Sequence, residues 1–407
     1  MRAFFQRVSV VALVLAALAV LGLFGWQAVL DRVAGAWTHA PEDAPWVLGD
    51  SAQALVDASF ADADPRGVLD AHVDVLPNGQ RLAPGVDAGH AAAAGDRRAT
   101  PLAWIAERVR DHAAGIRPGG RADAEYLARL LRQMRSMPVD YRARLFARDA
   151  VYDRQGRRDD AASVGYVANA YVAWLAEQAD DRLDFVVSIH PDRSDALDAL
   201  TRWAKAGAAG VVWQPIAQRF DPAGPSAQAF YKRIEELGLS LYLPLGGARA
   251  DNGSRGWIGV DALRAPLAAG VDVVVRLDEV VDDDGQSLMP ALFSLLREPA
   301  LAAQLHIELS GVVAGAQPEQ VLEPLLQHPQ FFKHLRYASG YPSPAIASAI
   351  DLAGLADAGF LDPGLIEPLR QIYDVNPLLF AFVLMRQMHL PGTTLTLPDA
   401  VFFTASS

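Results

Sequence analysis

The sequence of 407 residues contains no cysteine. Disulfide bonds, thiolate metal sites and a cysteine nucleophile are therefore excluded. The chain also lacks an excess of positive charge, since its net charge is -12. This balance argues against a nucleic-acid partner, which requires a basic face to neutralise phosphates. Hydrophobic residues make up 51% of the chain, enough to bury a large core in one barrel-sized domain or in two smaller domains.

A run without charged residues extends from Val8 to Trp26. At 1.5 Å per helical residue it nearly spans a hydrocarbon core, so it predicts a transmembrane anchor. A cleaved signal peptide is the alternative, although no clear small-residue cleavage site follows the run. Arg2 and Arg7 precede it, and the positive-inside rule then places the amino terminus in the cytoplasm. The predicted location is a bacterial inner membrane, with a single pass and the remaining chain on the extracytoplasmic side.

Composition divides the chain into four parts. We predict a cytoplasmic stub and anchor at 1–30, a tether at 31–67, a main domain at 68–395 and a C-terminal tail at 396–407. Inside the main domain, residues 77–120 form an insertion rich in Ala, Gly, Asp and Arg. Loops of this length inside a compact domain are typically lids or disordered segments, and we interpret this one as a lid.

Short β-rich runs alternate with segments of helical spacing along the main domain. Eight such alternations predict a parallel α/β sheet closed as a (β/α)8 TIM-like barrel, with tandem open sheets as the alternative architecture. One helix is expected to open at Asp123, and another to extend from an N-cap at Ser194 to Lys205. The eight predicted strands are 68–76, 142–147, 184–189, 209–213, 239–244, 271–277, 305–309 and 335–339.

The first predicted strand carries Asp70, His72 and Asp74. A strand that bears Asp-x-His-x-His at its carboxyl end aims two imidazoles into one pocket, because side chains two apart share a face. Here Asp74 stands in the place of the second imidazole. The strand is therefore one residue short of a metal-binding pattern.

Further motifs extend this pattern over most of residues 66–395, and together they resemble the amidohydrolase superfamily, in the branch similar to aminocarboxymuconate-semialdehyde decarboxylase. The resemblance implies a barrel fold and a hydrolase acting on C–N or C–O bonds, or a carboxy-lyase, with one or two divalent metals. The motifs that carry it are Leu69-Asp70-Ala71-His72, Val187-Ser188-Ile189-His190-Pro191, Trp213-Gln214-Pro215, Phe220-Asp221-Pro222, Gly340-Tyr341-Pro342-Ser343-Pro344 and Tyr373-Asp374-Val375-Asn376-Pro377.

The chain departs from the family at most of the metal-ligand positions that the resemblance implies. Pro244 and Leu277 stand where strands five and six are expected to supply a His, and Gly340 stands where strand eight is expected to supply the catalytic Asp. A catalytic zinc needs three protein ligands, and His72 and Asp74 alone remain. We therefore predict no cofactor, with one weakly bound zinc or manganese as the alternative.

Several polar residues remain as candidates for a site. His72, Asp74 and Glu308 are the candidate catalytic residues, although His72 also fits a buried structural role and Glu308 also fits a solvent-exposed one. An ion pair of Asp74 with Arg276 would replace the charge of the absent metal. His190 fits a strand-end hydrogen bond at least as well as chemistry. The predicted pocket residues are His190, Gln214, Arg276, Asp278, Ser339 and Tyr341.

Two classes of function follow. The first is a metal-free pseudoenzyme that binds an unknown small molecule or protein partner through the lid and the altered pocket. The second is an active hydrolase or decarboxylase-type lyase with a reduced or metal-independent site, since acid–base catalysis needs only two groups with separated pKa values.

Overall fold

The computed structural model describes residues 25–35, 47–61, 63, 67–76, 101–117, 121–163, 165–249, 255–277, 279–314 and 318–403. The predicted anchor at Val8 to Trp26 lies outside these residues except for its last two. Among the described residues no helix is both long enough and apolar enough to cross a membrane. The anchor therefore stays a prediction.

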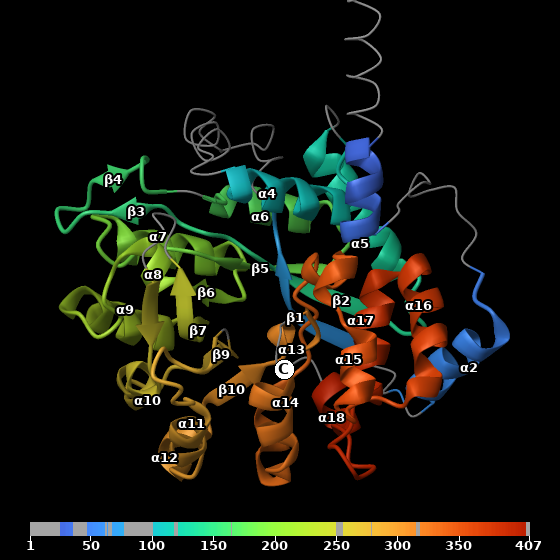
Figure 1. Cartoon of the computed structure of the whole chain (residues 1–407). Helices are drawn as coiled ribbons and strands as arrows, with labels where there is room; N and C mark the ends of the chain where they lie inside the picture. Colours follow the sequence, from blue (N-terminus) through green and yellow to red (C-terminus); the bar gives the residue numbers. More distant parts are fainter. Residues whose placement is uncertain are drawn as a thin grey trace, which may run out of the picture.

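Eight parallel strands form the centre of the molecule (Figure 1), and they coincide with the eight runs predicted from the sequence. Each strand pairs in parallel with the next one along the sheet. In sheet order they are β1 (Val68–Asp74), β2 (Tyr141–Phe146), β5 (Leu183–Val187), β6 (Gly210–Val212), β7 (Ser240–Arg249), β9 (Val273–Leu277), β10 (Leu305–Glu308) and β11 (Leu335–Arg336).

The sheet closes between its first strand and the segment that follows its last strand. Val73 forms a parallel bridge with Tyr341, and the Ala71 N–H donates to the Tyr337 carbonyl oxygen at 3.0 Å. These contacts make one barrel, so the predicted TIM-like fold is confirmed and the alternative of tandem open sheets is wrong. Three short strands lie outside the barrel: β3 (Val151–Tyr152), β4 (Arg158–Asp159) and β8 (Arg255–Ile258).

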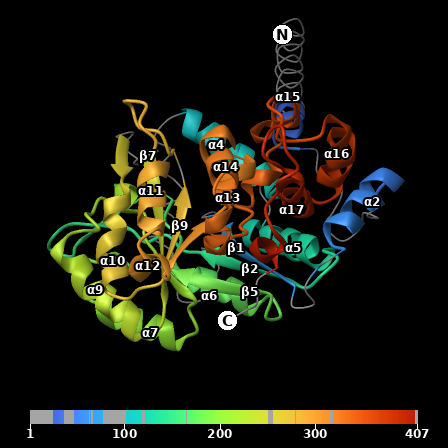
Figure 2. The same ribbon diagram turned by 90° about the horizontal axis from the view of Figure 1, so that it is seen from below.

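Helices surround the strands, with α9 and α10 on one side and α5, α16 and α17 on the other (Figure 2). Their apolar faces and the outward faces of the strands form one continuous core. The helices are α2 (Asp50–Ser59), α4 (Pro101–Ala113), α5 (Ala122–Arg135), α6 (Asn169–Glu177), α7 (Ala196–Lys205), α8 (Pro215–Gln218), α9 (Pro225–Glu236), α10 (Arg264–Ala268), α11 (Met289–Leu296), α12 (Pro299–Ala302), α13 (Ser310–Ala314), α14 (Pro318–Leu326), α15 (Leu352–Asp357), α16 (Ile366–Val375), α17 (Pro377–Gln387) and α18 (Asp399–Phe402).

The start of α7 differs from the prediction. The helix begins at Ala196 after Asp195, so Ser194 is not its N-cap. Its buried face is made by alanines and Leu200, while Leu197 lies on the exposed face. Small alanine side chains are weak markers of a buried helix face, so the sequence alone does not indicate this face clearly. The helix predicted from Asp123 is present as α5, with Tyr126, Leu130 and Leu131 buried.

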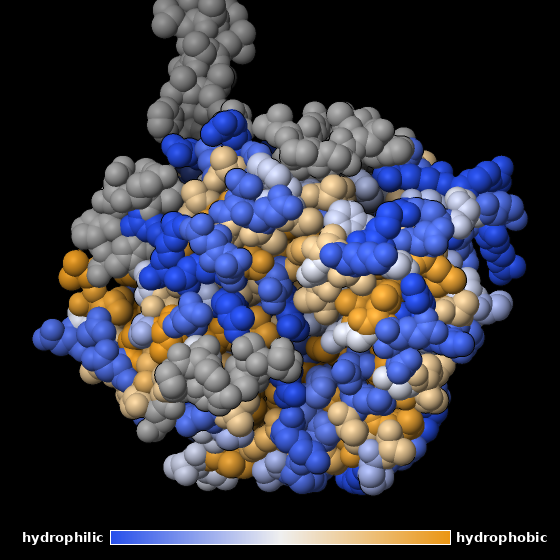
Figure 3. Space-filling model, turned by 180° about the vertical axis from the view of Figure 1, so that it is seen from behind, coloured by the Kyte–Doolittle hydropathy of each residue, from blue (hydrophilic) through white to orange (hydrophobic). Residues whose placement is uncertain are grey.

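Two segments outside the barrel strands pack against the part of the chain that closes the barrel. The described part of the predicted lid contains α4, which packs against the short 3-10 helix η4 (Ser343–Ala345) after the closing segment. The predicted C-terminal tail contains α18, whose Val401 and Phe402 are fully buried. The Val401 carbonyl accepts a hydrogen bond from the Tyr337 N–H at 3.0 Å, which fixes α18 to the barrel. Seen from behind, the surface is largely hydrophilic, with smaller hydrophobic areas between (Figure 3).

Candidate functional site

Strand β1 is irregular in its middle, and this irregularity decides which side chains face the barrel interior. Its register with β2 shifts between Asp70 and Val73. The Asp70 carboxylate accepts hydrogen bonds from the Tyr141 hydroxyl and the Ser339 N–H, both at 2.8 Å. Asp70 therefore fastens β1 to its two neighbours in the barrel and does not share the face of His72. Burial raises its pKa to about 6, and these hydrogen bonds limit the rise.

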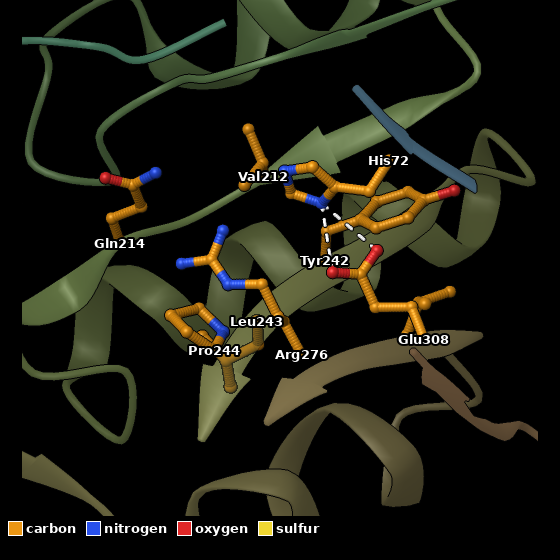
Figure 4. Close-up of a pocket in the computed structure, with 9 residues that line it drawn as sticks. His72, Val212, Gln214, Tyr242, Leu243, Pro244, Arg276 and Glu308 are labelled. Atoms are coloured by element: carbon orange, nitrogen blue, oxygen red, sulfur yellow. Dashed lines mark hydrogen bonds and ion pairs between the residues drawn. The ribbon is translucent and has the colours of Figure 1, made fainter. Parts of the chain in front are cut away.

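His72 lies between the carboxylates of Glu308 and Asp74 at the carboxyl end of the barrel, and Figure 4 shows the contact with Glu308. Its Nδ1 is 3.0 Å and 3.1 Å from the two carboxylate oxygens of Glu308, and its Nε2 is 3.1 Å from Asp74 Oδ1. The Ser310 hydroxyl donates to Glu308 Oε1 at 2.9 Å. His72 and Glu308 are buried, whereas the Asp74 side chain is 48% exposed. Both ring nitrogens are thus engaged by acidic partners.

This geometry holds the ring as an imidazolium. Burial alone would lower the pKa of His72, but the charges of Glu308 and Asp74 outweigh it and raise the pKa to about 10. For Asp74, burial acts to raise the pKa, and the attraction of His72, with smaller contributions from Arg276 and Arg110, lowers it to about 2. The buried positive charge is therefore carried by a side chain of the protein itself.

The cavity beside His72 is small. The room that a water-sized molecule can occupy is about 10 Å³, close to the minimum for a single water. Figure 4 shows the side chains of Gln214 and Arg276 pointing toward the same space as His72. Its lining residues are His72, Val212, Gln214, Tyr242, Leu243, Pro244, Val274, Arg276 and Glu308. A larger space lies outside the barrel between α15, α16 and α17, and water-sized molecules can occupy about 230 Å³ of it.

The structure gathers some of the predicted pocket residues and separates others. Gln214 and Arg276 line the cavity with His72 and Glu308. Ser339 does not line it, because its N–H bonds Asp70 and its hydroxyl accepts from the Tyr341 N–H at 3.0 Å. The Tyr341 hydroxyl turns away and accepts from Gln133 Nε2 at 3.1 Å. Asp278 lies outside the described residues.

His190 belongs to a separate structural network. Its Nε2 donates to the Gln218 carbonyl oxygen at 3.0 Å, and its Nδ1 accepts from the Asp192 N–H at 3.2 Å. Its own N–H donates to Asp149 Oδ2 at 2.8 Å. Burial lowers the pKa of His190, so the ring is neutral. The hydrogen-bonding role is the one that the geometry supports.

The described donor set does not fit a catalytic metal. Neither ring nitrogen of His72 can ligate an ion without first leaving a carboxylate, and the described residues contain no group of three His, Cys, Asp or Glu side chains that could hold one. Leu277 is buried outside the cavity lining. Gly340, at the expected Asp position, has a φ of +64°, and a Cβ there would lie 3.0 Å from the Ser310 carbonyl oxygen. An Asp would be strained at that position.

Phe146 is a site residue that the sequence analysis missed. Its ring stacks on His72 with a centroid distance of 3.9 Å and an interplanar angle of 8°. The face of an aromatic ring attracts a cation, so the stacked Phe146 ring stabilises the charged form of the His72 imidazole. The sequence contained part of the information needed to find Phe146. Phe146 ends β2 and pairs with Asp74 on β1, and paired residues on neighbouring parallel strands point to the same face of the sheet.

No family model matches the chain, and no curated protein matches it in sequence. Among solved structures it is similar to 5-carboxyvanillate decarboxylase from Sphingomonas paucimobilis, with 13% identity, 78% of this chain and 96% of that chain covered, and a TM-score of 0.41. It is also similar to the IDCase of Metarhizium anisopliae, with 12% identity, coverage of 78% and 94%, and a TM-score of 0.42. A probable 2-pyrone-4,6-dicarboxylic acid hydrolase from Acinetobacter baumannii has 13% identity, coverage of 68% and 85%, and a TM-score of 0.36. At these scores the likenesses carry no argument, and the barrel rests on the strand pairing of this chain.

Proposed function

We propose that this chain is a membrane-anchored, amidohydrolase-like barrel that binds a small molecule or protein partner without a metal and without catalysis. The observation that carries the proposal is the position of His72, whose two ring nitrogens are both within 3.1 Å of a carboxylate oxygen. The internal imidazolium supplies the positive charge that a metal supplies in the family that the sequence resembles. The charge of the His72 imidazolium balances the charges of the Glu308 and Asp74 carboxylates.

The same charges make His72 and Asp74 poor general bases at neutral pH. An imidazolium has no free lone pair, and a pKa of about 10 keeps His72 protonated. Asp74, with a pKa of about 2, is a weak base. A general base works best when its pKa lies near the operating pH, and neither residue meets that condition. The room of about 10 Å³ at the cavity also favours binding at the outer face of the barrel over binding inside it.

The membrane location is part of the proposal and depends on the uncharged run from Val8 to Trp26. With Arg2 and Arg7 on the cytoplasmic side, the barrel lies on the extracytoplasmic side. A reporter that is active only outside the cytoplasm, fused after Ser407, is expected to give signal. Signal from a reporter active only in the cytoplasm would overturn this orientation.

Metal content tests the main proposal. Elemental analysis of the full chain purified in detergent is expected to show well under one metal per chain. Added zinc or manganese is expected to leave the melting temperature nearly unchanged, because a ligand stabilises the folded state in proportion to its occupancy. A stoichiometric metal that is lost in His72→Gln would contradict the proposal.

A hydrolase or carboxy-lyase is the second candidate, and one observation favours it. The Arg276 guanidinium and the Gln214 amide line the cavity beside His72, and such donors stabilise a carboxylate or a developing oxyanion. Turnover of aromatic carboxylates or cyclic esters by the full chain, abolished in Arg276→Gln, would establish this candidate. We expect no turnover above that of the Arg276→Gln variant.

A further inference from the structure

The helix at 25–34, which continues directly from the predicted anchor, is fixed to α4 at two places. At one end, Trp26 stacks on Trp104 with a centroid distance of 5.7 Å and an interplanar angle of 21°. At the other, His112 Nε2 lies 3.0 Å from Asp31 Oδ1 and 3.0 Å from the Gly35 carbonyl oxygen. Residues 104 and 112 are two helical turns apart, so helix 25–34 contacts α4 at two separate places along its length.

Apolar side chains are exposed at the tryptophan end of this helix pair. Val29 is 49% exposed and Ile105 is 40% exposed, whereas Leu30 on the facing side is buried. Val29 lies one helical turn after Trp26, and Ile105 directly follows Trp104. Scattered apolar residues on a surface need no explanation, but these two flank an aromatic pair at the point where an uncharged run of the sequence ends.

The predicted anchor determines how deep the tryptophan end of the helix pair lies relative to a bilayer. If the run from Val8 to Trp26 spans the hydrocarbon core, Trp26 lies at the membrane–water interface, where tryptophan is enriched. Trp104 is stacked on Trp26 and must lie at a similar depth. Ile105 is then placed where an exposed apolar side chain is favoured by contact with lipid and disfavoured in water.

Helix α4 also lies at the carboxyl-end rim of the barrel. It packs against η4, which follows the segment that closes the barrel. The charge of Arg110 on α4 contributes to the lowered pKa of Asp74. One helix is therefore in contact with the segment that leaves the predicted anchor and close to the candidate site.

We propose that helix 25–34 and α4 form a surface that contacts the lipid bilayer and holds the carboxyl-end rim of the barrel toward the membrane. This inference rests on the proposed anchoring. It goes further, because a tether alone would leave the barrel free to turn in any direction. A ligand or partner that reaches the site does so at the membrane surface, beside the lipid headgroups.

The absence of cysteine makes the surface directly testable in the full chain. Ile105→Cys is labelled with an environment-sensitive fluorophore, and the protein is reconstituted into vesicles of phosphatidylethanolamine and phosphatidylglycerol, with and without a nitroxide-bearing lipid. The matched control is Leu395→Cys, which is 36% exposed and lies in the loop between α17 and α18. We expect the nitroxide lipid to quench the label at position 105 at least about twofold more strongly than the label at position 395, because only the first is expected at headgroup depth.

Flotation of the same vesicles separates the two levels of the proposal. If the chain floats with the vesicles and both labels are quenched equally weakly, the bilayer-contacting surface is overturned while the anchoring stands. If the chain does not float, the anchoring fails and the surface fails with it. Val29→Cys serves as a second probe on helix 25–34, should the label at position 105 disturb the packing of α4, and the same preferential quenching is expected there.

Discussion

His72 and His190 lie near the ends of two barrel strands and are both buried, yet they carry different charges. Burial acts on both to lower the pKa. At His190 the ring partners are a backbone carbonyl and a backbone N–H, and burial prevails. At His72 the partners are Glu308 and Asp74, and their charges reverse the effect. The identity of two neighbours decides whether a buried histidine is neutral or a cation.

The comparison also shows why only one of the two histidines needs acidic partners. An imidazolium needs carboxylates to balance its charge, and Glu308 and Asp74 are the carboxylates that do so at His72. The neutral ring of His190 needs no carboxylate beside it, because its ring nitrogens bind a backbone carbonyl and a backbone N–H. The following tests disturb the His72 arrangement and use other positions as controls.

Glu308→Ala is expected to have the largest effect. It removes a buried carboxylate and leaves the His72 imidazolium with only the half-exposed Asp74 as an acidic partner. Breaking a buried ion pair in this way costs about 3–5 kcal/mol of unfolding free energy. Urea denaturation of the detergent-solubilised chain measures the loss. Glu298→Ala removes an exposed carboxylate that binds Arg264 at 2.9 Å and is expected to change little. Equal losses in both variants would contradict the buried pair.

Alkaline pH is expected to weaken the fold through His72. Its folded pKa of about 10 lies above the unfolded value of 6.5, so its contribution is complete below pH 6.5 and is lost as the pH rises toward 10. One such group lowers the unfolding free energy by at most about 1.4 kcal/mol per pH unit in this window. Melting curves between pH 7 and 9 are expected to fall more steeply for the parent than for His72→Gln. Identical slopes would show that His72 is neutral.

Gly340→Ala tests the closing segment beside His72. The Gly340 N–H donates to the His72 carbonyl oxygen at 3.0 Å, and its φ of +64° is unfavourable for residues with a Cβ. The combination of backbone strain and contact with Ser310 is expected to cost about 1–3 kcal/mol. Gly207→Ala, with a φ of +91° and no atom within 4 Å of a Cβ, isolates the strain alone. A larger loss at position 207 would argue against the contact.

Asp74→Asn is expected to have the smallest effect on stability. Asp74 is half exposed, and pairs of that kind contribute about 1 kcal/mol or less. Its effect on charge is larger, because the substitution removes one of the two groups that raise the pKa of His72. NMR titration of the ring should show a lower pKa for His72 than in the parent and an unchanged neutral His190. An unchanged pKa of His72 would mean that Glu308 alone raises it.

The barrel was predictable because helical segments alternate with its strands, and the buried strands are apolar enough to be recognised. The position of Glu308 was predictable only as one of two orientations, since alternation along 305–309 does not say which face is inside. The structure resolves this choice by placing Glu308 against His72. The paired contact joins residues from β1 and β10, and no local pattern encodes it.

The orientation of Asp70 could not be predicted from its spacing. Residues 70, 72 and 74 share a face only in a regular strand, and β1 changes register between Asp70 and Val73. That shift is defined by the partner strand, which lies far along the chain. Likewise, the role of His190 depends on Asp149, which follows β2, and on Gln218, the last residue of α8. The sequence motifs located the barrel strands correctly. They did not indicate which side chains and backbone groups contact one another.

The closure of the barrel by its first and last strands has a consequence for how the chain folds. Asp70 and the Ser339 N–H that it accepts from are 269 residues apart in sequence. At synthesis rates of roughly 5–20 residues per second, about 13–54 s pass between the synthesis of β1 and that of the segment that completes it. During that interval one edge of β1 has no partner from the closing segment, and contacts of such long separation form slowly. An unpaired strand edge can pair with other chains, so this interval is when the growing chain is most exposed to aggregation.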